Sequence, residues 1–182
     1  MIEAARNGDK NAFKELIMKY EPQVAKTVIG MLGQGPEAED IGQETFIRFY
    51  RSLNQFKGES SPGTYITRIA INLSLNELKR RKLKAKIFFQ RQESHTGDDL
   101  LNNLTDKNND YHTKIARTVQ KGIDLLDAKS RAVIVLRLID GYSTAETAQI
   151  LELPIGTVLS RLARAQKKLK SILQPFLEGG VS

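Results

Sequence analysis

The sequence predicts an all-α protein made of two small helical domains joined by a flexible polar linker. Apolar residues recur at helical spacing in both halves of the chain, and no stretch shows sustained strand-like alternation of apolar and polar residues. Between about 84 and 111 the helical period is lost, and Gln, Ser, Asn, Asp, Gly and Thr predominate, as in a linker. We therefore expect domains at 1–86 and 113–182, with the linker at 87–112.

The first domain is predicted to hold an opening helical segment and two further helices. Residues 9 to 32 carry apolar side chains at helical spacing, and Asp9 is positioned to cap them. A Gly-Gln-Gly-Pro turn at 33–36 ends this pattern, and acidic residues that suit the helix dipole begin the next helix. A third pattern runs from about Thr64 to Leu83 and ends in a basic tail. The apolar positions are Phe13, Leu16, Ile17, Tyr20, Val24, Val28, Ile66, Ile69, Ala70, Leu73 and Leu78, and the acidic ones are Glu37, Glu39, Asp40 and Glu44.

Four helices are predicted in the second domain. Ile115, Val119, Ile123 and Leu126 mark the first, and the uninterrupted apolar run at 132–136 marks a second, more deeply buried helix. The third and fourth span about 144–151 and 155–173, and they meet across a short turn.

These last two helices have the features of a helix-turn-helix. Ser143 and Glu146 are spaced to form a capping box, and Pro154 suits the first turn of the following helix, where its missing N–H costs nothing. One face of that helix is apolar and should pack inward, while the other is polar and basic. The apolar face consists of Val158, Leu162, Ala165, Leu169 and Ile172, and the outer face of Thr157, Ser160, Arg161, Arg164, Lys167, Lys168 and Lys170.

The basic outer face predicts DNA binding. In a helix-turn-helix the start of the second helix enters the major groove, where arginine can bind guanine and lysines lie near phosphates. The net charge of +7 and pI near 9.6 also favour an anionic partner. The alternative is a solvated basic face on an ordinary helical hairpin, which does not explain why capping box, turn, proline and basic face coincide.

The composition excludes several classes of function. The chain has no cysteine, which rules out disulfides, thiolate zinc sites and cysteine nucleophiles. Its two histidines, His95 and His112, lie in the polar linker without metal-ligand spacing or a nucleophile motif, so we expect no metal, no cofactor and no enzymatic activity. We find no signal-peptide core and no run approaching the roughly 20 apolar residues of a membrane span, which predicts a cytoplasmic protein.

Two sets of motifs resemble the extracytoplasmic-function sigma factors of bacterial RNA polymerase. In the second domain, LDAKSRAVIVLR at 126–137 and LPIGTVLSRLARA at 153–165 resemble region four of that family. In the first domain, EAEDIGQETFIRFY at 37–50, FKGESS at 56–61 and TYITRIAINL at 64–73 resemble region two. The two sets occur in the family's order, on either side of a polar linker, and together they span nearly the whole chain.

The resemblance implies that region two docks on the clamp helices of the largest polymerase subunit. For Phe46 and Phe49 the alternative is burial in the protein core. The matching positions are Asp40, Gln43, Glu44, Phe46, Arg48 and Phe49.

The resemblance also implies that a loop of region two holds a flipped base of the minus-ten promoter element. The matching loop is 56–61, where Gly58 permits unusual backbone angles, and a plain surface turn is the alternative. Residues spaced by three and four on the next helix share a face that suits stacking and hydrogen bonding with unpaired bases. The minus-ten positions are Phe56, Lys57, Gly58, Glu59, Ser60, Tyr65, Arg68, Asn72, Asn76, Lys79 and Arg80.

Charged segments complete the predicted contacts. A run of lysines and arginines at 79–86 contains no acidic residue and is expected to follow DNA phosphates. The alternative, that these cations neutralise the dipole at a helix end, would explain only one or two of the charges. Acids in the linker suggest, by analogy with the family, a segment that mimics RNA. The cations are Lys79, Arg80, Arg81, Lys82, Lys84 and Lys86, and the acids are Glu93, Asp98, Asp99, Asp106 and Asp110. The minus-thirty-five element would be read by Thr157, Ser160, Arg161, Arg164, Lys167 and Lys168.

The chain departs from the family pattern at several of these positions. Pro62-Gly63 and Tyr65 stand where an aromatic–basic pair and a tryptophan are common, so the loop is expected to read a different base. In region four Thr144-Ala145 replaces Tyr-Glu, Glu152 replaces a turn glycine, and Leu159 replaces a lysine that would contact DNA.

The resemblance predicts a monomer that binds core RNA polymerase and promoter DNA and is restrained by an anti-sigma factor, in some cases at the membrane. Region four would grip the minus-thirty-five duplex while region two traps unpaired minus-ten bases, with the holoenzyme on the nucleoid. The alternative is a stand-alone helix-turn-helix regulator, which would bind a palindrome as a dimer without polymerase.

Overall fold

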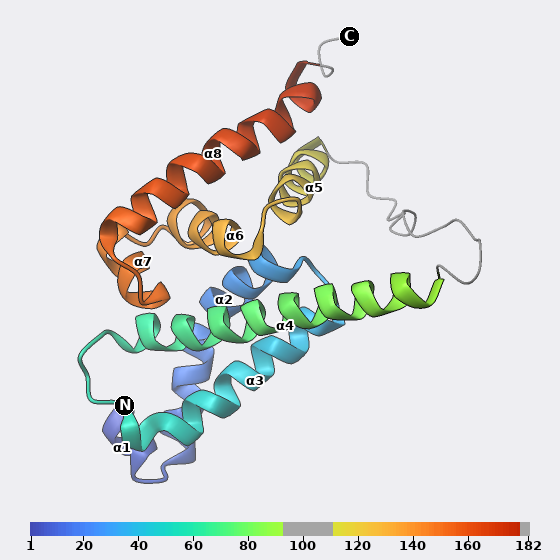
Figure 1. Cartoon of the computed structure of the whole chain (residues 1–182). Coiled ribbons are helices and arrows are strands. Elements are labelled where there is room, and N and C mark those ends of the chain that lie inside the picture. Colours follow the sequence, from blue (N-terminus) through green and yellow to red (C-terminus); the bar gives the residue numbers. More distant parts are fainter. Residues whose placement is uncertain (93–110, 179–182) are drawn as a thin grey trace.

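The computed structural model describes residues 1–92 and 111–178, and within these ranges all regular structure is helical (Figure 1). The predicted all-α class is confirmed. None of the helices in these ranges is long and apolar enough to cross a bilayer. The N-terminal helices are α1 (Ile2–Arg6), α2 (Lys10–Leu32), α3 (Pro36–Ser52) and α4 (Pro62–Gln92), with a short 3-10 turn, η1 (Leu53–Gln55), after α3. The C-terminal helices are α5 (Tyr111–Asp124), α6 (Ala128–Ile134), α7 (Thr144–Leu151) and α8 (Ile155–Glu178), and a π-helical turn, η2 (Val135–Ile139), continues α6.

Polar caps begin the long N-terminal helices. The Asp9 carboxylate accepts hydrogen bonds from the backbone N–H groups of Asn11 (2.8 Å) and Ala12 (3.1 Å), which confirms the predicted cap of α2. The Ser61 hydroxyl accepts from the backbone N–H of Thr64 at 3.0 Å, so α4 begins slightly earlier than its apolar pattern indicated.

Helix replaces part of the predicted linker at both of its ends. α4 continues to Gln92 rather than ending near Leu83, and α5 begins at Tyr111. Leu83 and Ile87 are exposed, so this end of α4 leaves the core and needs no apolar stripe, while its Leu, Lys and Ala residues favour helix. The segment 93–110, with the predicted RNA-mimicking acids and His95, lies outside the described residues.

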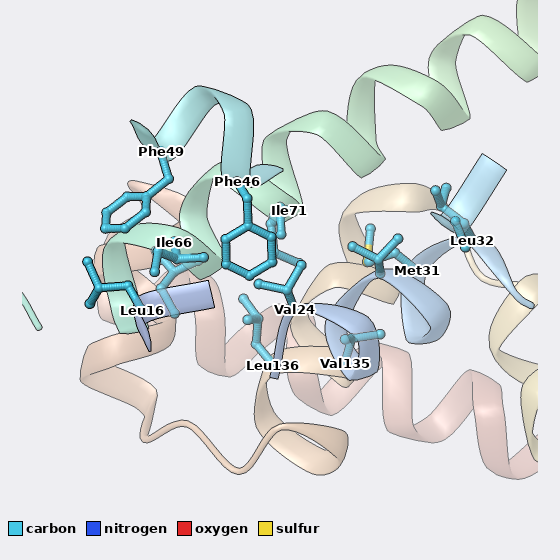
Figure 2. Close-up of a cluster of buried hydrophobic side chains, with 14 of the residues drawn as sticks. Leu16, Val24, Met31, Leu32, Phe46, Phe49, Ile66, Ile71, Val135 and Leu136 are labelled. Atoms are coloured by element: carbon cyan, nitrogen blue, oxygen red, sulfur yellow. The ribbon is translucent and has the colours of Figure 1, made fainter. Parts of the chain in front are cut away.

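The N-terminal and C-terminal helices share one hydrophobic core. Val135 and Leu136 of η2 lie beside Val24 and Met31 of α2 (Figure 2), and all four side chains are buried. A Cβ atom at Gly30 would lie 3.0 and 3.1 Å from the two Val135 methyl groups, so the backbone of α2 approaches η2 closely. In this structure the two predicted domains therefore pack against each other.

The carboxyl end of α2 is capped by side chains from three other helices. The last carbonyl groups of an α-helix have no partner within the helix and carry partial negative charge. Here Gly30, Met31 and Leu32 each have such a carbonyl oxygen that accepts a side-chain hydrogen bond. The donors, in that order, are Gln120 of α5 (3.4 Å), Arg131 of α6 (2.7 Å) and Arg81 of α4 (3.1 Å). The end of α2 is thus a joint between the two sets of helices.

A polar seam crosses the same interface. The Tyr142 hydroxyl forms a hydrogen bond with the Thr67 hydroxyl at 2.8 Å, and the Gln23 amide donates to both hydroxyls. The Thr27 hydroxyl donates to the carboxylate of Asp140 at 2.8 Å. Burial raises the pKa of Tyr142, and burial raises the pKa of Asp140 to about 6 despite the Thr27 hydrogen bond.

Asp140→Asn should stabilise the fold at neutral pH by about 1–2 kcal/mol, since the partly buried carboxylate loses hydration and asparagine can still accept from Thr27. The folded-state pKa of Asp140 lies above its unfolded-state value. The contribution of Asp140 to the free energy of unfolding is therefore most favourable below about pH 4, where the carboxyl is protonated in both states, and it is lost as the pH rises through 6. Urea unfolding at pH 7.5 and pH 4.5 should therefore show the variant's advantage shrinking at the lower pH. Glu15→Gln, at an exposed carboxylate, is the control, and an equal advantage at both pH values would contradict the assignment.

Candidate nucleic-acid interface

The predicted helix-turn-helix is formed by α7, the turn after it, and α8. The Ser143 backbone N–H donates to the Glu146 carboxylate at 2.8 Å, and the Glu146 N–H donates to the Ser143 hydroxyl at 3.1 Å, which confirms the capping box. The hydrogen bonds from Ser143 lower the pKa of Glu146. Val158 and Ala165 are buried against the preceding helices, as the apolar face of α8 predicted.

The turn between the two helices has an unusual backbone. Glu152 adopts a left-handed conformation with φ of 52°, the only positive φ outside glycine in the described residues. The Pro154 carbonyl accepts from the N–H groups of Thr157 (2.9 Å) and Val158 (3.2 Å), so Pro154 precedes α8 rather than occupying its first turn. Leu159, which replaces the family's lysine, is exposed.

The outer face of α8 presents the predicted basic residues. Ser160, Arg164, Lys167 and Lys168 are exposed, and Thr157 and Arg161 are half-buried. Arg164 Nε donates to the Ser160 carbonyl at 3.2 Å, which steadies its guanidinium along the helix. These positions match the face that a helix-turn-helix presents to the major groove.

A shallow polar hollow beside this face adds two residues that the sequence analysis missed. It has a volume of about 270 Å³ and brings Lys129 and Ser130 of α6 next to Arg161, Arg164 and Lys168 of α8. Four of these five side chains are cationic, and Asp127 is the one acidic residue that lines the same hollow. The excess of cations suits a surface that follows phosphates. The signal for Lys129 and Ser130 was their place in the first turn of α6, which Asp127 caps by accepting from the Ser130 N–H at 3.0 Å.

The second predicted nucleic-acid face lies on α4. Asn72 and Asn76 are exposed, and Tyr65 and Arg68 are half-buried on the same side of the helix. The Arg68 guanidinium lies 5.2 Å from the centre of the Tyr65 ring, in cation–π geometry. An aromatic ring, a cation and two amides therefore form one row, which can stack with bases and hydrogen-bond to them.

The loop before α4 differs in part from its predicted role. Gly58 has φ of 77°, the left-handed region that favours glycine. Lys57 and Glu59 are exposed, but Phe56 is buried with its ring centre 5.1 Å from that of Tyr65. Phe56 is one of the predicted minus-ten positions, but its ring is buried in the core and packs against the Tyr65 ring, so the Phe56 side chain offers no surface on which a base could stack. Ser60 is half-buried.

An arginine of α1 anchors the base of this loop. Arg6 donates from its guanidinium to the carbonyl oxygens of Leu53 (3.1 Å) and Phe56 (2.7 Å). Both carbonyls flank the turn from α3 into the loop, so α1 ties the start of the loop to the helical body.

Two of the six predicted phosphate-contacting cations on α4 have partners within the protein. Arg80 forms an ion pair with Glu77 at 2.6 Å, and the hydrogen bond from Arg80 lowers the pKa of Glu77. Arg81 caps α2 and lies 3.5 Å from Glu77. All six residues precede the end of α4 at Gln92, so the helix-end interpretation no longer applies. The phosphate-contacting role now rests on the exposed Lys79, Lys82, Lys84 and Lys86.

A separate apolar groove runs between α2 and α3. It has a volume of about 1010 Å³ and is lined by residues of these helices and of the turn between them. Phe46 lies at its buried base, while Ile47 and Tyr50 are 45% and 48% exposed. Large apolar side chains that are about half exposed to solvent are typical of a protein-binding surface.

The groove contains only part of the predicted polymerase-binding set. Gln43 and Phe46 line it, and Asp40 and Arg48 are exposed elsewhere on α3, where Arg48 pairs with Glu44 at 2.7 Å. Phe49 is fully buried between helices (Figure 2), so its predicted contact with polymerase is corrected to the core alternative.

Ile47, Tyr50 and Arg51 of α3 also line the groove, and the predicted polymerase-binding set did not include them. The buried stripe of α3 consists of Ala38, Thr45, Phe46 and Phe49, whereas Ile47 and Tyr50 are exposed. Helical spacing alone does not tell which of these apolar positions faces the groove.

Comparisons with known proteins identify the family of each part of the chain. Residues 16–84 match the family Sigma-70 region 2, and residues 116–169 match Sigma-70, region 4. The RNA polymerase sigma-H factor of Pseudomonas aeruginosa is 33% identical over 181 residues, which cover 97% of this chain and 94% of that protein. The ECF RNA polymerase sigma-E factor of Escherichia coli K12 is 32% identical with the same coverage of both chains.

Solved structures share the fold. CnrH, in complex with the cytosolic domain of CnrY, superposes with a TM-score of 0.69 at 24% identity, over 96% of this chain and 95% of that chain. The sigma factor RpoE of Bartonella quintana, in complex with the anti-sigma factor NepR, superposes with a TM-score of 0.65 at 21% identity, over 90% of this chain and 97% of that chain.

Proposed function

The chain belongs to the ECF RNA polymerase sigma factors, and from that premise we propose how its surfaces divide the work of promoter recognition. As a sigma factor it directs transcription initiation. A stand-alone regulator is not favoured, because regions two and four occur in one chain and the relatives match along nearly their whole length. Sigma factors are not a class of enzyme.

The α2–α3 groove is the docking surface for core polymerase in this proposal. Ile47 and Tyr50 form its exposed apolar rim, and Gln43 and Arg51 supply polar edges that can orient a helix of the partner. Because the groove is lined by α2 and α3 while the base-contacting row lies on α4, polymerase and DNA can bind region two at the same time. This separation of the two surfaces is the observation that carries the proposal.

The row on α4 captures the minus-ten strand. Tyr65 offers an aromatic surface, Asn72 and Asn76 offer amide donors and acceptors, and Gly58 lets the preceding loop approach an extruded base. Stacking on protein is worth roughly 1–3 kcal/mol per base, which offsets the cost of unstacking it from the duplex. Strand separation then needs no covalent chemistry.

Region four holds the minus-thirty-five duplex through the start of α8. Arg161 and Arg164 are placed to reach guanine edges, while Lys129, Lys167 and Lys168 lie where phosphates would pass. The free protein acts as a monomer in the cytoplasm, joins the nucleoid within the holoenzyme, and is restrained by an anti-sigma factor, in some conditions at the membrane. The structure of RpoE in complex with the anti-sigma factor NepR, and that of CnrH in complex with the cytosolic domain of CnrY, support a protein partner for this fold.

The double variant Ile47→Gln/Tyr50→Gln should weaken binding to core polymerase by about tenfold, since two large apolar side chains that become buried on binding typically contribute energy on this scale. Fluorescence anisotropy of labelled protein against purified core enzyme measures the affinity, and run-off transcription measures the consequence.

Met18→Gln is the control, because Met18 lies on α2, the other helix that lines the groove, is 65% exposed and is outside the groove itself. Retained circular dichroism and melting temperature would show that the double variant still folds. Undiminished polymerase binding by the folded double variant would contradict the assignment of the groove.

A further inference from the structure

The side of α8 that faces solvent has two edges of different chemistry. Residues spaced by three and four along one edge are polar or cationic, whereas residues spaced by four along the other edge are apolar and exposed. The cationic edge consists of Thr157, Arg161, Arg164 and Lys168, and the apolar edge of Ile155, Leu159 and Ala163. Phosphates attract the first edge but not the second, so the apolar edge needs a different partner on the DNA.

The core of the protein does not use this apolar edge. The inward side of α8 is formed by Val158 and Ala165, which are buried, and by half-buried Leu162. Ile155 and Leu159 are each about half exposed and belong to none of the hydrophobic clusters of the described residues. A single exposed leucine is common on protein surfaces, but these two large side chains lie one turn apart and form a continuous strip.

Gly156 indicates that a partner approaches this part of α8 closely. Glycine within a helix is destabilising relative to alanine. A Cβ atom at Gly156 would have no other part of the protein within 4 Å, and its φ is not positive, so the fold does not require glycine here. What glycine provides is a stretch of bare backbone between Ile155 and Ser160, against which base edges can lie.

The cationic edge indicates how α8 lies in the major groove. Lys168 lines a hollow together with Lys129 of α6, so the phosphates of one strand are expected on that side of the helix. A helix with its side chains is roughly 10–12 Å across, and the major groove is roughly 12 Å wide. The helix therefore fills the groove, and the apolar edge lies against base edges away from that strand.

Thymine is the base whose major-groove edge suits an apolar side chain. Guanine and adenine present hydrogen-bonding groups there, cytosine presents an amino donor, and thymine presents a 5-methyl group beside its acceptor. An apolar side chain over a donor or acceptor would exclude water without replacing the lost hydrogen bond, which lowers affinity. Over the methyl group, the same side chain buries apolar surface on both partners.

We propose that Leu159 reads a thymine of the minus-thirty-five element by packing on its 5-methyl group, while Ile155 shields the contact from water. The proposal rests on the assignment of α8 to the minus-thirty-five duplex. Leu159 makes the contact because it lies beside Ser160, nearer the middle of the solvent-facing side than Ile155 does. Specificity at this base pair thus comes from an apolar contact, and the arginines act at other pairs.

The contact is tested in the holoenzyme by removing one chemical group from the DNA. This chain with purified core polymerase first selects its preferred sequence from duplexes randomised in both promoter elements, and a T·A pair should be selected in the minus-thirty-five element. Each thymine of that element is then replaced by deoxyuridine, which pairs identically but lacks the methyl group. At one position the affinity should fall about three- to fourfold, as expected for one buried methyl group.

Variants at Leu159 identify the side chain that senses the methyl group. Leu159→Ala should bind the thymine and deoxyuridine duplexes equally, because alanine does not reach the methyl group. Leu159→Met should keep most of the discrimination, since methionine is apolar and of similar volume. Leu138→Ala is the matched control and should discriminate like the wild type: Leu138 is 52% exposed against 51% for Leu159, and it lies on η2, outside the helix-turn-helix.

Arg164→Ala separates this inference from the assignment of α8. It should weaken binding about tenfold on the thymine and deoxyuridine duplexes alike, as expected for the loss of an arginine that contacts guanine. If neither Arg164→Ala nor Leu159→Ala changes the affinity, α8 does not hold the minus-thirty-five element. If Arg164→Ala weakens binding but no thymine responds to deoxyuridine, or Leu159→Ala responds as the wild type does, the leucine contact alone is overturned.

Discussion

Phe49→Ala should lower the free energy of unfolding by about 3–5 kcal/mol, the usual cost of removing a fully buried phenyl ring. The Phe49 ring packs between α2 and α4, with its centre 6.2 Å from those of Phe13 and Tyr65. Leu16 and Ile66 complete the surrounding cluster (Figure 2). Removal of the Phe49 ring would leave a cavity that α2 and α4 can close only in part.

The comparison with Ile47 makes this prediction specific. Ile47 lies two residues earlier on α3 but is 45% exposed at the rim of the groove, so Ile47→Ala should cost less than about 1 kcal/mol. Urea denaturation at constant pH measures both variants. Equal losses of stability would contradict the division of α3 into a core face and a binding face.

Arg131→Met should cost about 3 kcal/mol and weaken the contact between regions two and four. The Arg131 guanidinium donates to the carbonyl oxygens of Met31 in region two and of Asp124 and Leu126 in region four. Methionine matches much of its volume but donates no hydrogen bond, and each buried carbonyl left without a partner costs roughly 1–3 kcal/mol. Burial lowers the pKa of Arg131, and Asp124, 3.1 Å away, favours its charged form.

Arg81→Met is the matched control for this variant. Arg81 donates to the neighbouring carbonyl of Leu32, but it is partly exposed, so water can replace the lost hydrogen bond. Its expected cost is below about 1 kcal/mol. Chemical denaturation reports the stability difference. Spin labels on Asn54→Cys and Gln166→Cys, two exposed positions in this cysteine-free chain, report the distance between the two sets of helices. If Arg131→Met lowered the free energy of unfolding no more than Arg81→Met does, the stabilisation from capping the carbonyl groups of α2 would not depend on whether the donor side chain is buried.

Local patterns predicted much of the region-four interface. A capping box depends on two residues three positions apart, and the sides of α8 follow from helical spacing, so spacing alone could place Ser143, Glu146 and the basic face. The same reasoning placed Tyr65, Arg68, Asn72 and Asn76 on one face of α4. Whether these faces contact DNA stays a prediction.

Spacing could not distinguish the aromatic positions of α3 that face the core from those that face the groove. Phe46, Phe49 and Tyr50 all lie within one and a half turns, and which of them is buried depends on where α2 and α4 pack. The end of α4 was misjudged for a related reason: where a helix leaves the core, the apolar period that signals it disappears although the helix continues.

The sequence by itself determined the helical class, the two-region plan and the family, because spacing, capping and motif order are properties of neighbouring residues. Only the tertiary structure decided that the regions close on each other, that Arg131 and Arg81 cap α2, and that Glu152 meets Arg68. These contacts join residues 49 to 100 positions apart, and no local rule specifies which distant groups will meet. They arise because one hydrophobic core buries helices from both regions, and the polar groups at its edge must then find partners across the interface.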